Sequence, residues 1–334
     1  MSAPFKTLSV IGGGAWGTAL AQLAAFNGAR TTLWAREPEV AAAVALKREN
    51  TVFLPGVRLH EGISATAILQ EAAAAEAFLL AAPAQHTRAI AAAVGPLARR
   101  GAAVALCSKG VERETGLLLT EVLQAAWPTA RPAVLSGPSF ARDVARGLPT
   151  AVTLACPDRD LGARWLATLG APHFRPYLSD DLVGAELGGA VKNVLAIAAG
   201  VVEGRRFGDS ARAAVIARGF AEFQRLGLAL GARRETMAGL SGLGDLILTA
   251  TSRQSRNMAL GAALGEGKPI AEALAGQNAV VEGAATAPAL VTLAKKARVD
   301  MPIANAVADL VSGARRVDEV VADLLARPFR EEND

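Results

Sequence analysis

The chain has 334 residues, and 51% of them are hydrophobic, which provides enough apolar sequence for two globular domains. The net charge of +4 is spread along the chain, and aromatic residues make up only 4%; both observations argue against a nucleic-acid partner and favour acidic small molecules such as phosphates. Cys107 and Cys156 belong to no Cys/His cluster, so we expect reduced thiols and no metal site.

The start of the chain and its longest apolar run bear on where the protein is located. The first residues lack the charged and apolar pattern of a secretory leader. The apolar run over residues 191–202 contains a lysine and is too short to cross a bilayer. We therefore expect a cytoplasmic protein with no membrane span.

The first predicted element is a buried strand over residues 7–11, which leads through glycines into a helix over residues 18–26. Gly12, Gly14 and Gly17 satisfy G-x-G-x-x-G. In that pattern the glycines permit a tight turn, a close approach of the backbone to a pyrophosphate, and close packing of helix on strand. This context predicts a dinucleotide-binding site at the N-terminus of the helix.

The second strand, over residues 31–34, is followed by Arg36 and Glu37, where a dinucleotide-binding unit contacts the adenosine ribose. An arginine suits the 2′-phosphate of NADP(H), whereas an acidic residue suits the 2′-hydroxyl of NAD(H). We predict a preference for NADP(H), with NAD(H) as the alternative cofactor because Glu37 lies next to Arg36.

Strand and helix patterns alternate through the rest of the first half. Further strands are expected at residues 77–82, 102–107, 133–135, 151–155 and 174–177, and further helices at residues 66–75, 86–98, 115–126 and 160–169. This order predicts an α/β, Rossmann-like domain over residues 1–180, with a mostly parallel sheet covered on both faces.

Two segments follow the carboxyl ends of strands in this domain, where ligands bind in open α/β sheets. Lys109 comes directly after the strand at 102–107, so it is placed to reach a phosphate or a reacting carbonyl. Residues 136–141, with the sequence Ser-Gly-Pro-Ser-Phe-Ala, form a stiff loop that we expect to be a second wall of the site.

The second half, residues 181–334, reads as an all-helical domain whose first helix, over residues 182–202, is apolar on most faces. Lys192 lies within this helix, and desolvation there would lower its pKa toward the range useful for acid–base chemistry. Gly188 and Gly189, one turn earlier, would leave open space beside the ammonium. The alternative is a buried ion pair of Lys192 with Glu186 or Asp245.

Two further segments of the helical half carry polar groups. Asp245 follows a glycine-rich stretch and could bind a substrate hydroxyl, orient Lys192 or cap a helix. Residues 251–254 have the form of a capping box, which would place the next three residues in the first turn of a helix. Ser255, Arg256 and Asn257 there would make a phosphate site, or else only a capped surface turn.

Seven spaced segments together resemble the bacterial-type NAD(P)-dependent glycerol-3-phosphate dehydrogenase family: GGGAWGTALA, LCSKGVE, SGPSFARDVARGLPTA, LGGAVKNVLAI, GLGDLILT, SRN and VVEG. The resemblance implies interconversion of dihydroxyacetone phosphate and sn-glycerol 3-phosphate for glycerophospholipid synthesis by a homodimer. It implies that Lys192 is the proton donor and acceptor. Implied substrate contacts are Lys109, Gly137, Ser139, Lys192, Asp245, Ser255, Arg256 and Asn257; implied cofactor contacts are Gly12, Gly14, Ala15, Trp16, Gly17, Arg36, Lys109, Ala141, Arg256, Val280 and Glu282.

The sequence departs from the family pattern at two places. Ala15 stands where the family often has serine, which removes a hydroxyl but keeps the backbone N–H, and Arg142-Asp143 replaces the usual Lys-Glu pair. Two alternative functions remain: a two-domain dehydrogenase acting on a hydroxy acid, and a non-catalytic NADP-binding sensor. The phosphate-binding appearance of Arg256 and Asn257 argues against the first, and a catalytic role for Lys192 argues against the second.

Overall fold

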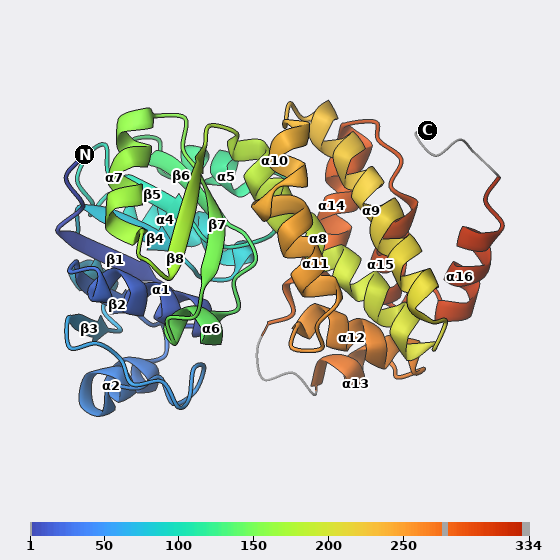
Figure 1. Cartoon of the computed structure of the whole chain (residues 1–334), viewed down its shortest axis with the longest axis horizontal. Coiled ribbons are helices and arrows are strands. Elements are labelled where there is room, and N and C mark those ends of the chain that lie inside the picture. The colour runs from blue at the N-terminus through green and yellow to red at the C-terminus, as the bar shows by residue number, and fades with distance from the viewer. Residues whose placement is uncertain (1, 276–279, 329–334) are drawn as a thin grey trace. The chain divides into compact units, whose positions relative to one another are not determined.

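The computed structural model describes residues 2–275 and 280–328, and the chain divides into two compact units (Figure 1). The first unit contains the residues up to Ser108 and the segment Leu119–Ala185. The second contains Lys109–Leu118 and the residues from Glu186 onward. Lys109 therefore packs with the helical residues, although it directly follows a strand of the sheet.

The first unit contains an eight-stranded sheet in the order β3-β2-β1-β4-β5-β6-β7-β8. Its strands are β1 (Thr7–Ile11), β2 (Arg30–Trp34), β3 (Ile63–Thr66), β4 (Ala77–Leu80), β5 (Ala103–Leu106), β6 (Arg131–Ser136), β7 (Thr150–Ala155) and β8 (Phe174–Ser179). All neighbouring strands are parallel except β6 and β7, which pair antiparallel. The predicted Rossmann-like, mostly parallel sheet is confirmed.

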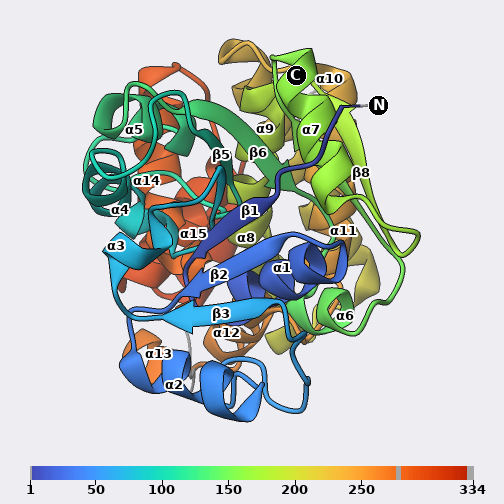
Figure 2. The ribbon, with the colours of Figure 1, turned by 90° about the vertical axis from the view of Figure 1, so that its left-hand side faces the viewer.

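Helices cover both faces of this sheet (Figure 2). One face carries α1 (Ala15–Phe26), α6 (Ala141–Ala145) and α7 (Arg159–Leu169), and the other carries α3 (Leu69–Ala72), α4 (Thr87–Val94) and α5 (Leu119–Ala126); α2 (Pro38–Lys47) and a short 3-10 turn, Ala84–His86, complete the unit. The central strands β4 and β5 are apolar and buried on both sides, because helices cover both faces of the sheet there.

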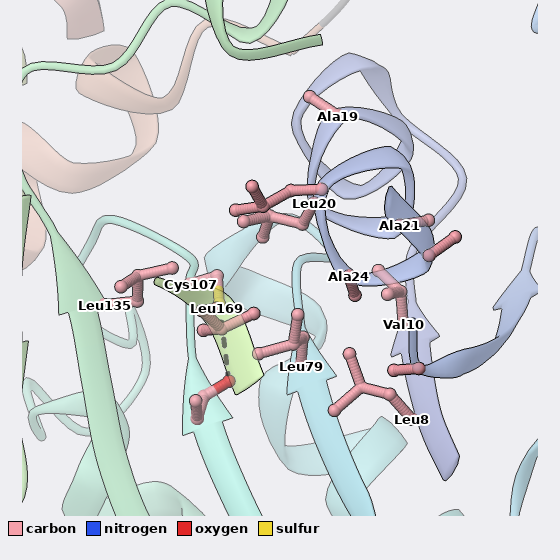
Figure 3. Close-up of a cluster of buried hydrophobic side chains, with 14 of the residues drawn as sticks. Leu8, Val10, Ala19, Leu20, Ala21, Ala24, Leu79, Cys107, Leu135 and Leu169 are labelled. Carbon is pink, nitrogen blue, oxygen red and sulfur yellow. Dashed lines mark hydrogen bonds between the residues drawn. The ribbon is translucent and has the colours of Figure 1, made fainter. Parts of the chain in front are cut away.

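The core on the α1 side shows how the strand–turn–helix at the start of the chain is held (Figure 3). Leu8 and Val10 of β1, Leu79 of β4 and Leu20 of α1 belong to one hydrophobic cluster, and all four side chains are fully buried. Burial of one such side chain stabilises the fold by about 1.5–3 kcal/mol. This packing fixes the turn between β1 and α1 in place.

Three expected helices are shorter than predicted. The helix expected over 86–98 is α4, which ends at Val94. In the other two, backbone pairing shortens the helix. Residues 63–66 pair with β2 as strand β3, so the helix expected over 66–75 is reduced to α3. The helix expected over 115–126 begins only at Leu119, because the preceding residues form a tight turn in which the Glu112 N–H donates to the Leu117 carbonyl at 3.0 Å. In both places local backbone pairing overrides the helical pattern.

Every described element of the second unit is helical, as predicted. The helices are α8 (Leu182–Gly204), α9 (Asp209–Ala229), α10 (Arg234–Ala238), a π-helical turn η2 (Leu240–Gly244), α11 (Asp245–Ala250), α12 (Arg256–Gly265), α13 (Ile270–Ala275), α14 (Glu282–Lys296), α15 (Pro302–Ser312) and α16 (Val317–Leu325).

Helix α8 agrees with the helix expected over residues 182–202, and the apolar run over residues 191–202 forms only part of it. By length and composition alone, the whole 23-residue helix would be long and apolar enough to cross a membrane. However, 94% of its most apolar window is buried inside the protein. α8 is therefore a core helix, and its apolar character reflects burial on most faces.

Candidate active site

The glycine turn between β1 and α1 has the geometry predicted for a dinucleotide site. Gly12 has φ +127°, and a Cβ there would lie 2.6 Å from the backbone nitrogen of Ala82. A Cβ at Gly17 would overlap the carbonyl oxygen of Gly12, so α1 packs directly on the turn. A Cβ at Gly14 would meet no other described atom within 4 Å. The turn is closed at its first and third glycines and open at its second, which leaves space for a ligand.

The N-terminus of α1 is free of acidic side chains in its first turn, so its positive end faces no competing negative charge there. Ala15 and Trp16 begin the helix, and the buried indole N–H of Trp16 has no hydrogen-bond partner within the described part of the chain. An open helix N-terminus with an unused donor beside it fits an anionic ligand such as a pyrophosphate.

Asn50 anchors this turn, a role that the sequence analysis missed. Its side chain is fully buried and donates to the Gly13 carbonyl and to Thr18 Oγ1, each at 2.8 Å. The side-chain oxygen of Asn50, Oδ1, accepts from the Phe53 N–H at 3.0 Å. These bonds hold the glycine turn against the loop that follows α2. Nothing in the sequence around Asn50 indicates this long-range contact.

The residues expected at the adenosine ribose lie immediately after β2. Arg36 donates to Glu37 Oε1 through Nη2 at 2.8 Å and through Nε at 3.2 Å. The Arg36 side chain is 72% exposed and that of Glu37 is 30% exposed. The two residues that favour different cofactors therefore form one ion pair, in which Arg36 is exposed and Glu37 is partly buried.

The predicted second wall follows β6. Gly137 has φ +151°, and a Cβ there would lie 2.9 Å from Val152 Cα, so the loop packs closely on β7. Ser139 Oγ donates to the Gly137 carbonyl at 3.0 Å, and Ala141 is the first residue of α6. The structure adds that the Ser139 hydroxyl is engaged within the loop.

In the second unit, a buried carboxylate joins two lysines. Asp245 accepts from Lys192 Nζ at 2.9 Å and from Lys109 Nζ at 2.6 Å, so the two ammonium groups share one side chain. The exposed side-chain fractions are 11% for Lys192, 14% for Lys109 and 1% for Asp245. Lys192 also donates to Thr249 Oγ1 at 2.8 Å. The buried ion pair of Lys192 with Asp245, given above as the alternative for Lys192, is therefore present. The same contact is the one that orienting Lys192, one of the three roles considered for Asp245, would require.

Burial and charge act in opposite directions on this cluster. Burial lowers the pKa of Lys192 to about 8, helped by the charge of Lys109 and opposed by Asp245 and Glu282. Burial alone would raise the pKa of Asp245, but the charges and hydrogen bonds of Lys109 and Lys192 outweigh it and lower that pKa below its usual value. The cluster therefore holds one carboxylate as an anion beside an amine that titrates near neutral pH.

The π-helical turn η2 brings Asp245 to Lys192. This turn packs on α8 at Gly188, where a Cβ would overlap the Ser241 carbonyl and lie 3.0 Å from Gly242 Cα. The open space predicted at Gly188 is therefore wrong: the glycine is required because the backbone of another helix crosses there. Thr249 lies one helical turn after Asp245, and its hydroxyl donates to the backbone carbonyl of Asp245 at 2.7 Å.

The predicted phosphate site lies at the start of α12. Ser255 is the N-cap residue, and its side chain accepts from the Met258 N–H at 3.3 Å. The helix therefore begins at Arg256, and the expected capping box at 251–254 is wrong because the Thr251 hydroxyl instead donates to the Ile247 carbonyl at the end of α11. A helix N-terminus carrying a guanidinium remains a suitable anion site.

Side chains of this first turn tie three helices together. Arg256 Nη1 donates to the Val280 carbonyl at 2.9 Å. Asn257 donates through Nδ2 to Asn193 Oδ1 and accepts from the Gly283 N–H, each at 2.9 Å. The start of α12 is thereby fixed beside the α8 segment that carries the catalytic candidate and beside the first turn of α14, which begins at Glu282.

Comparison with known proteins assigns the chain to a family. Sequence models of the NAD-dependent glycerol-3-phosphate dehydrogenase N-terminus and C-terminus match residues 7–162 and 181–322. The chain belongs to the NAD-dependent glycerol-3-phosphate dehydrogenase family. A glycerol-3-phosphate dehydrogenase [NAD(P)+] of Parvibaculum lavamentivorans is 58% identical, covering 99% of this chain and 100% of its own length. The protein of the same name from Caulobacter vibrioides is 56% identical, with 98% and 99% covered.

The fold agrees with this assignment. The crystal structure of glycerol-3-phosphate dehydrogenase from Coxiella burnetii is similar with a TM-score of 0.92 and 35% identity, covering 96% of this chain and 99% of that one. The predicted resemblance to the glycerol-3-phosphate dehydrogenase family is therefore confirmed.

Proposed function

We propose that this member of the family interconverts dihydroxyacetone phosphate and sn-glycerol 3-phosphate by hydride transfer with NAD(P)H. The observation that carries the proposal is the buried cluster of Lys192, Asp245 and Lys109, which holds a titratable amine next to a second positive charge. Such a pair suits a reaction in which negative charge develops on a substrate oxygen and a proton must follow.

The cofactor is assigned to the glycine turn of the first unit. The open position at Gly14, the N-terminus of α1 and the unused indole donor of Trp16 fit its pyrophosphate, and Arg36 fits a ribose 2′-phosphate. NADP(H) is the preferred cofactor and NAD(H) the alternative. The expected division into a cofactor domain (residues 1–180) and a substrate domain (residues 181–334) is part of the same proposal, as are the remaining implied contacts, Ala141, Val280 and Glu282.

The phosphate of the substrate is assigned to the first turn of α12. The Arg256 guanidinium supplies a planar fork of donors for phosphate oxygens, and the partial positive charge of the helix N-terminus adds to it. Ser255 and Asn257 shape this turn through the hydrogen bonds described above. On the first unit, Gly137 and Ser139 are proposed as further substrate contacts. A fixed phosphate holds the carbonyl of the substrate in a constant position.

The residues of the cluster then have distinct tasks in the reduction of the ketone. The reduced nicotinamide, when bound, supplies the hydride to the carbonyl carbon. As the carbonyl π bond breaks, its electron pair moves to oxygen, and Lys192 Nζ gives that oxygen a proton, leaving the amine neutral. Lys109 stabilises the developing charge, and Asp245 keeps both ammonium groups oriented. In the oxidation of the alcohol, neutral Lys192 accepts the proton.

The cellular setting is proposed from the family resemblance. The product sn-glycerol 3-phosphate would supply the backbone of glycerophospholipids. We place the enzyme in the cytoplasm as a homodimer that binds a small phosphorylated substrate, with no nucleic-acid partner and no metal. No cluster of metal-binding side chains is present among the residues that the structure describes.

A spectrophotometric assay with dihydroxyacetone phosphate tests this function. Oxidation of NADPH, and of NADH at a lower rate, is the expected result. Turnover only on a carboxylated ketone would instead identify a hydroxy-acid dehydrogenase. Tight NADPH binding without turnover on either ketone would identify a non-catalytic sensor, and both outcomes would overturn the proposal.

A further inference from the structure

The turn after β2 carries two opposite charges at the place where the cofactor ribose is expected. Its backbone is fixed by the glycine turn, because the Gly12 N–H donates to the Trp34 carbonyl at 3.0 Å. A Cβ at Gly13 would lie 2.5 Å from Ala35 Cβ, so the two turns touch. The turn after β2 is therefore held directly beside the proposed dinucleotide site.

A small apolar cluster beneath this turn adds to its rigidity. Ala35 and Val40 are fully buried and pack with Ala41, against the partly buried Phe53 and Ala65. The chain between Ala35 and Val40 thus has both ends anchored in a core. Between these anchors, the Arg36 side chain is 72% exposed and the Glu37 side chain is 30% exposed, so a ligand can reach the pair from the Arg36 side.

We propose that Glu37 is a specificity-determining residue that allows the site to accept NAD(H) as well as NADP(H). This inference rests on the proposed function. The carboxylate of Glu37 provides an acceptor for the 2′-hydroxyl of an unphosphorylated ribose. The same carboxylate pairs with Arg36 and places a negative charge close to any 2′-phosphate that Arg36 binds. Arg36 selects for the phosphate, and Glu37 limits that selection.

Arg36 can exchange Glu37 for a 2′-phosphate because its side chain is 72% exposed. An ion pair in water is worth only about 0–1 kcal/mol, so Arg36 leaves Glu37 easily when a phosphate offers two charge-assisted hydrogen bonds. A buried pair would hold the guanidinium in place and exclude the phosphate. The Glu37 carboxylate therefore competes weakly with a 2′-phosphate for Arg36.

The charge-neutral variant Glu37→Gln tests the proposal. Glu37 is the N-cap residue of α2, but its side chain makes no capping hydrogen bond, so the substitution leaves the start of the helix intact. Calorimetric dissociation constants of NADP+ and NAD+ give a readout that does not depend on turnover, and kcat/KM with NADPH and NADH on dihydroxyacetone phosphate adds a second. Glu39→Gln removes the same charge from the first turn of α2 and is the matched control.

We expect Glu37→Gln to raise the preference for NADP+ over NAD+ by about tenfold, from the lost repulsion and the weakened hydroxyl contact together. Arg36→Gln should shift the same ratio toward NAD+ by at least as much. A ratio in Glu37→Gln that equals the ratio in the parent protein or in Glu39→Gln would overturn the inference. If the binding ratio shifts while dihydroxyacetone phosphate is not reduced, the inference stands and the proposed function fails.

Discussion

Two carboxylates of the second unit are equally buried and behave in opposite ways. Asp245 of α11 is 1% exposed and Glu222 of α9 is 2% exposed. The pKa of Asp245 is lowered, whereas burial raises the pKa of Glu222 to about 7. Since both have lost contact with water, the difference lies in the groups that surround them.

The partners of Glu222 are mostly neutral. Its two oxygens accept from the N–H groups of Ile303 at 2.8 Å and Ala304 at 3.3 Å, in the first turn of α15. These bonds and the charge of Arg225 lower its pKa only in part, and the charge of Asp300 raises it further. Asp245 instead contacts two ammonium groups directly. For Glu222 the two N–H groups and Arg225 offset only part of the effect of burial on the pKa, whereas for Asp245 two directly bound ammonium groups outweigh it.

The largest effect should come from removing the titratable amine of the site. Lys192→Ala should lower kcat by about 10²–10⁴-fold, because the developing alkoxide loses its proton donor. NADPH affinity should be nearly unchanged, and the protein should fold, because Asp245 keeps Lys109 as a partner at 2.6 Å. Steady-state kinetics and calorimetric NADPH binding check this.

The control for this variant is Lys295→Ala, which removes an exposed lysine from the end of α14. It should leave kcat unaltered. If Lys192→Ala retained most of the parental turnover, the amine would be a structural partner of Asp245 and nothing more, and the proton-transfer role would be wrong.

The second effect should come from removing the charge of Asp245. Asp245 raises the pKa of Lys192, so Asp245→Asn should lower that pKa below about 8 and leave two ammonium groups facing each other. In the reduction of the ketone, which needs protonated Lys192, the falling limb of the pH–kcat profile should move to lower pH by about one unit or more. Kinetics from pH 6 to 9 measure the shift.

A surface ion pair provides the matched comparison for that variant. Asp209→Asn removes an acid that is 90% exposed and pairs with Arg212, so its pH profile should match the parent profile. A falling limb that stays in place in Asp245→Asn would mean that the carboxylate does not set the protonation of Lys192.

Glu222 allows the converse experiment on stability. Because its pKa is raised from 4.5 to about 7 in the folded state, the protonated carboxyl stabilises the fold below pH 4.5, and this contribution is lost as the pH rises through about 7. Glu222→Gln keeps an acceptor oxygen without the charge. The parent protein should therefore lose about 2 kcal/mol of unfolding free energy relative to Glu222→Gln between pH 5 and 8.

Urea unfolding at several pH values measures this difference, with Glu272→Gln, an exposed acid of α13, as the control. A constant difference in unfolding free energy between the parent protein and Glu222→Gln at every pH would show that Glu222 titrates normally. The contrast between the two buried acids would then disappear.

The sequence predicted local features better than contacts between distant segments. The strand–glycine–helix unit was predictable because its signal lies within a few residues, and Lys192 was conspicuous as a charge in an apolar helix. The edge strand β3 was missed because its apolar–polar alternation extends over only four residues. The contact of Gly188 with Ser241 and the bonds of Asn50 were missed because no local pattern encodes them. Thr249 was detectable, since it lies four residues after Asp245 on one helix.

Thr249 allows a test of a single hydrogen bond of the site, the one that the Lys192 ammonium group donates to its hydroxyl. Its hydroxyl donates to the Asp245 carbonyl at 2.7 Å and accepts from Lys192 at 2.8 Å. Thr251, two residues later, donates to the Ile247 carbonyl at 2.6 Å in the same way but is exposed and lies at the helix end. Each threonine hydroxyl thus donates to the backbone carbonyl four residues earlier, but only that of Thr249 also accepts from the Lys192 ammonium group.

We expect Thr249→Val to lower kcat by about tenfold or less, because Lys192 loses one of its hydrogen-bond acceptors and is held less firmly. The loss of that acceptor should also lower the pKa of Lys192, so the falling limb of the pH profile should move slightly to lower pH. Thr251→Val should change neither quantity. Equal effects of both variants on kcat and on the melting temperature, with no shift of the pH profile, would show that the hydroxyl of Thr249 only stabilises α11. A purely structural hydrogen bond would leave the pKa of Lys192 unaltered.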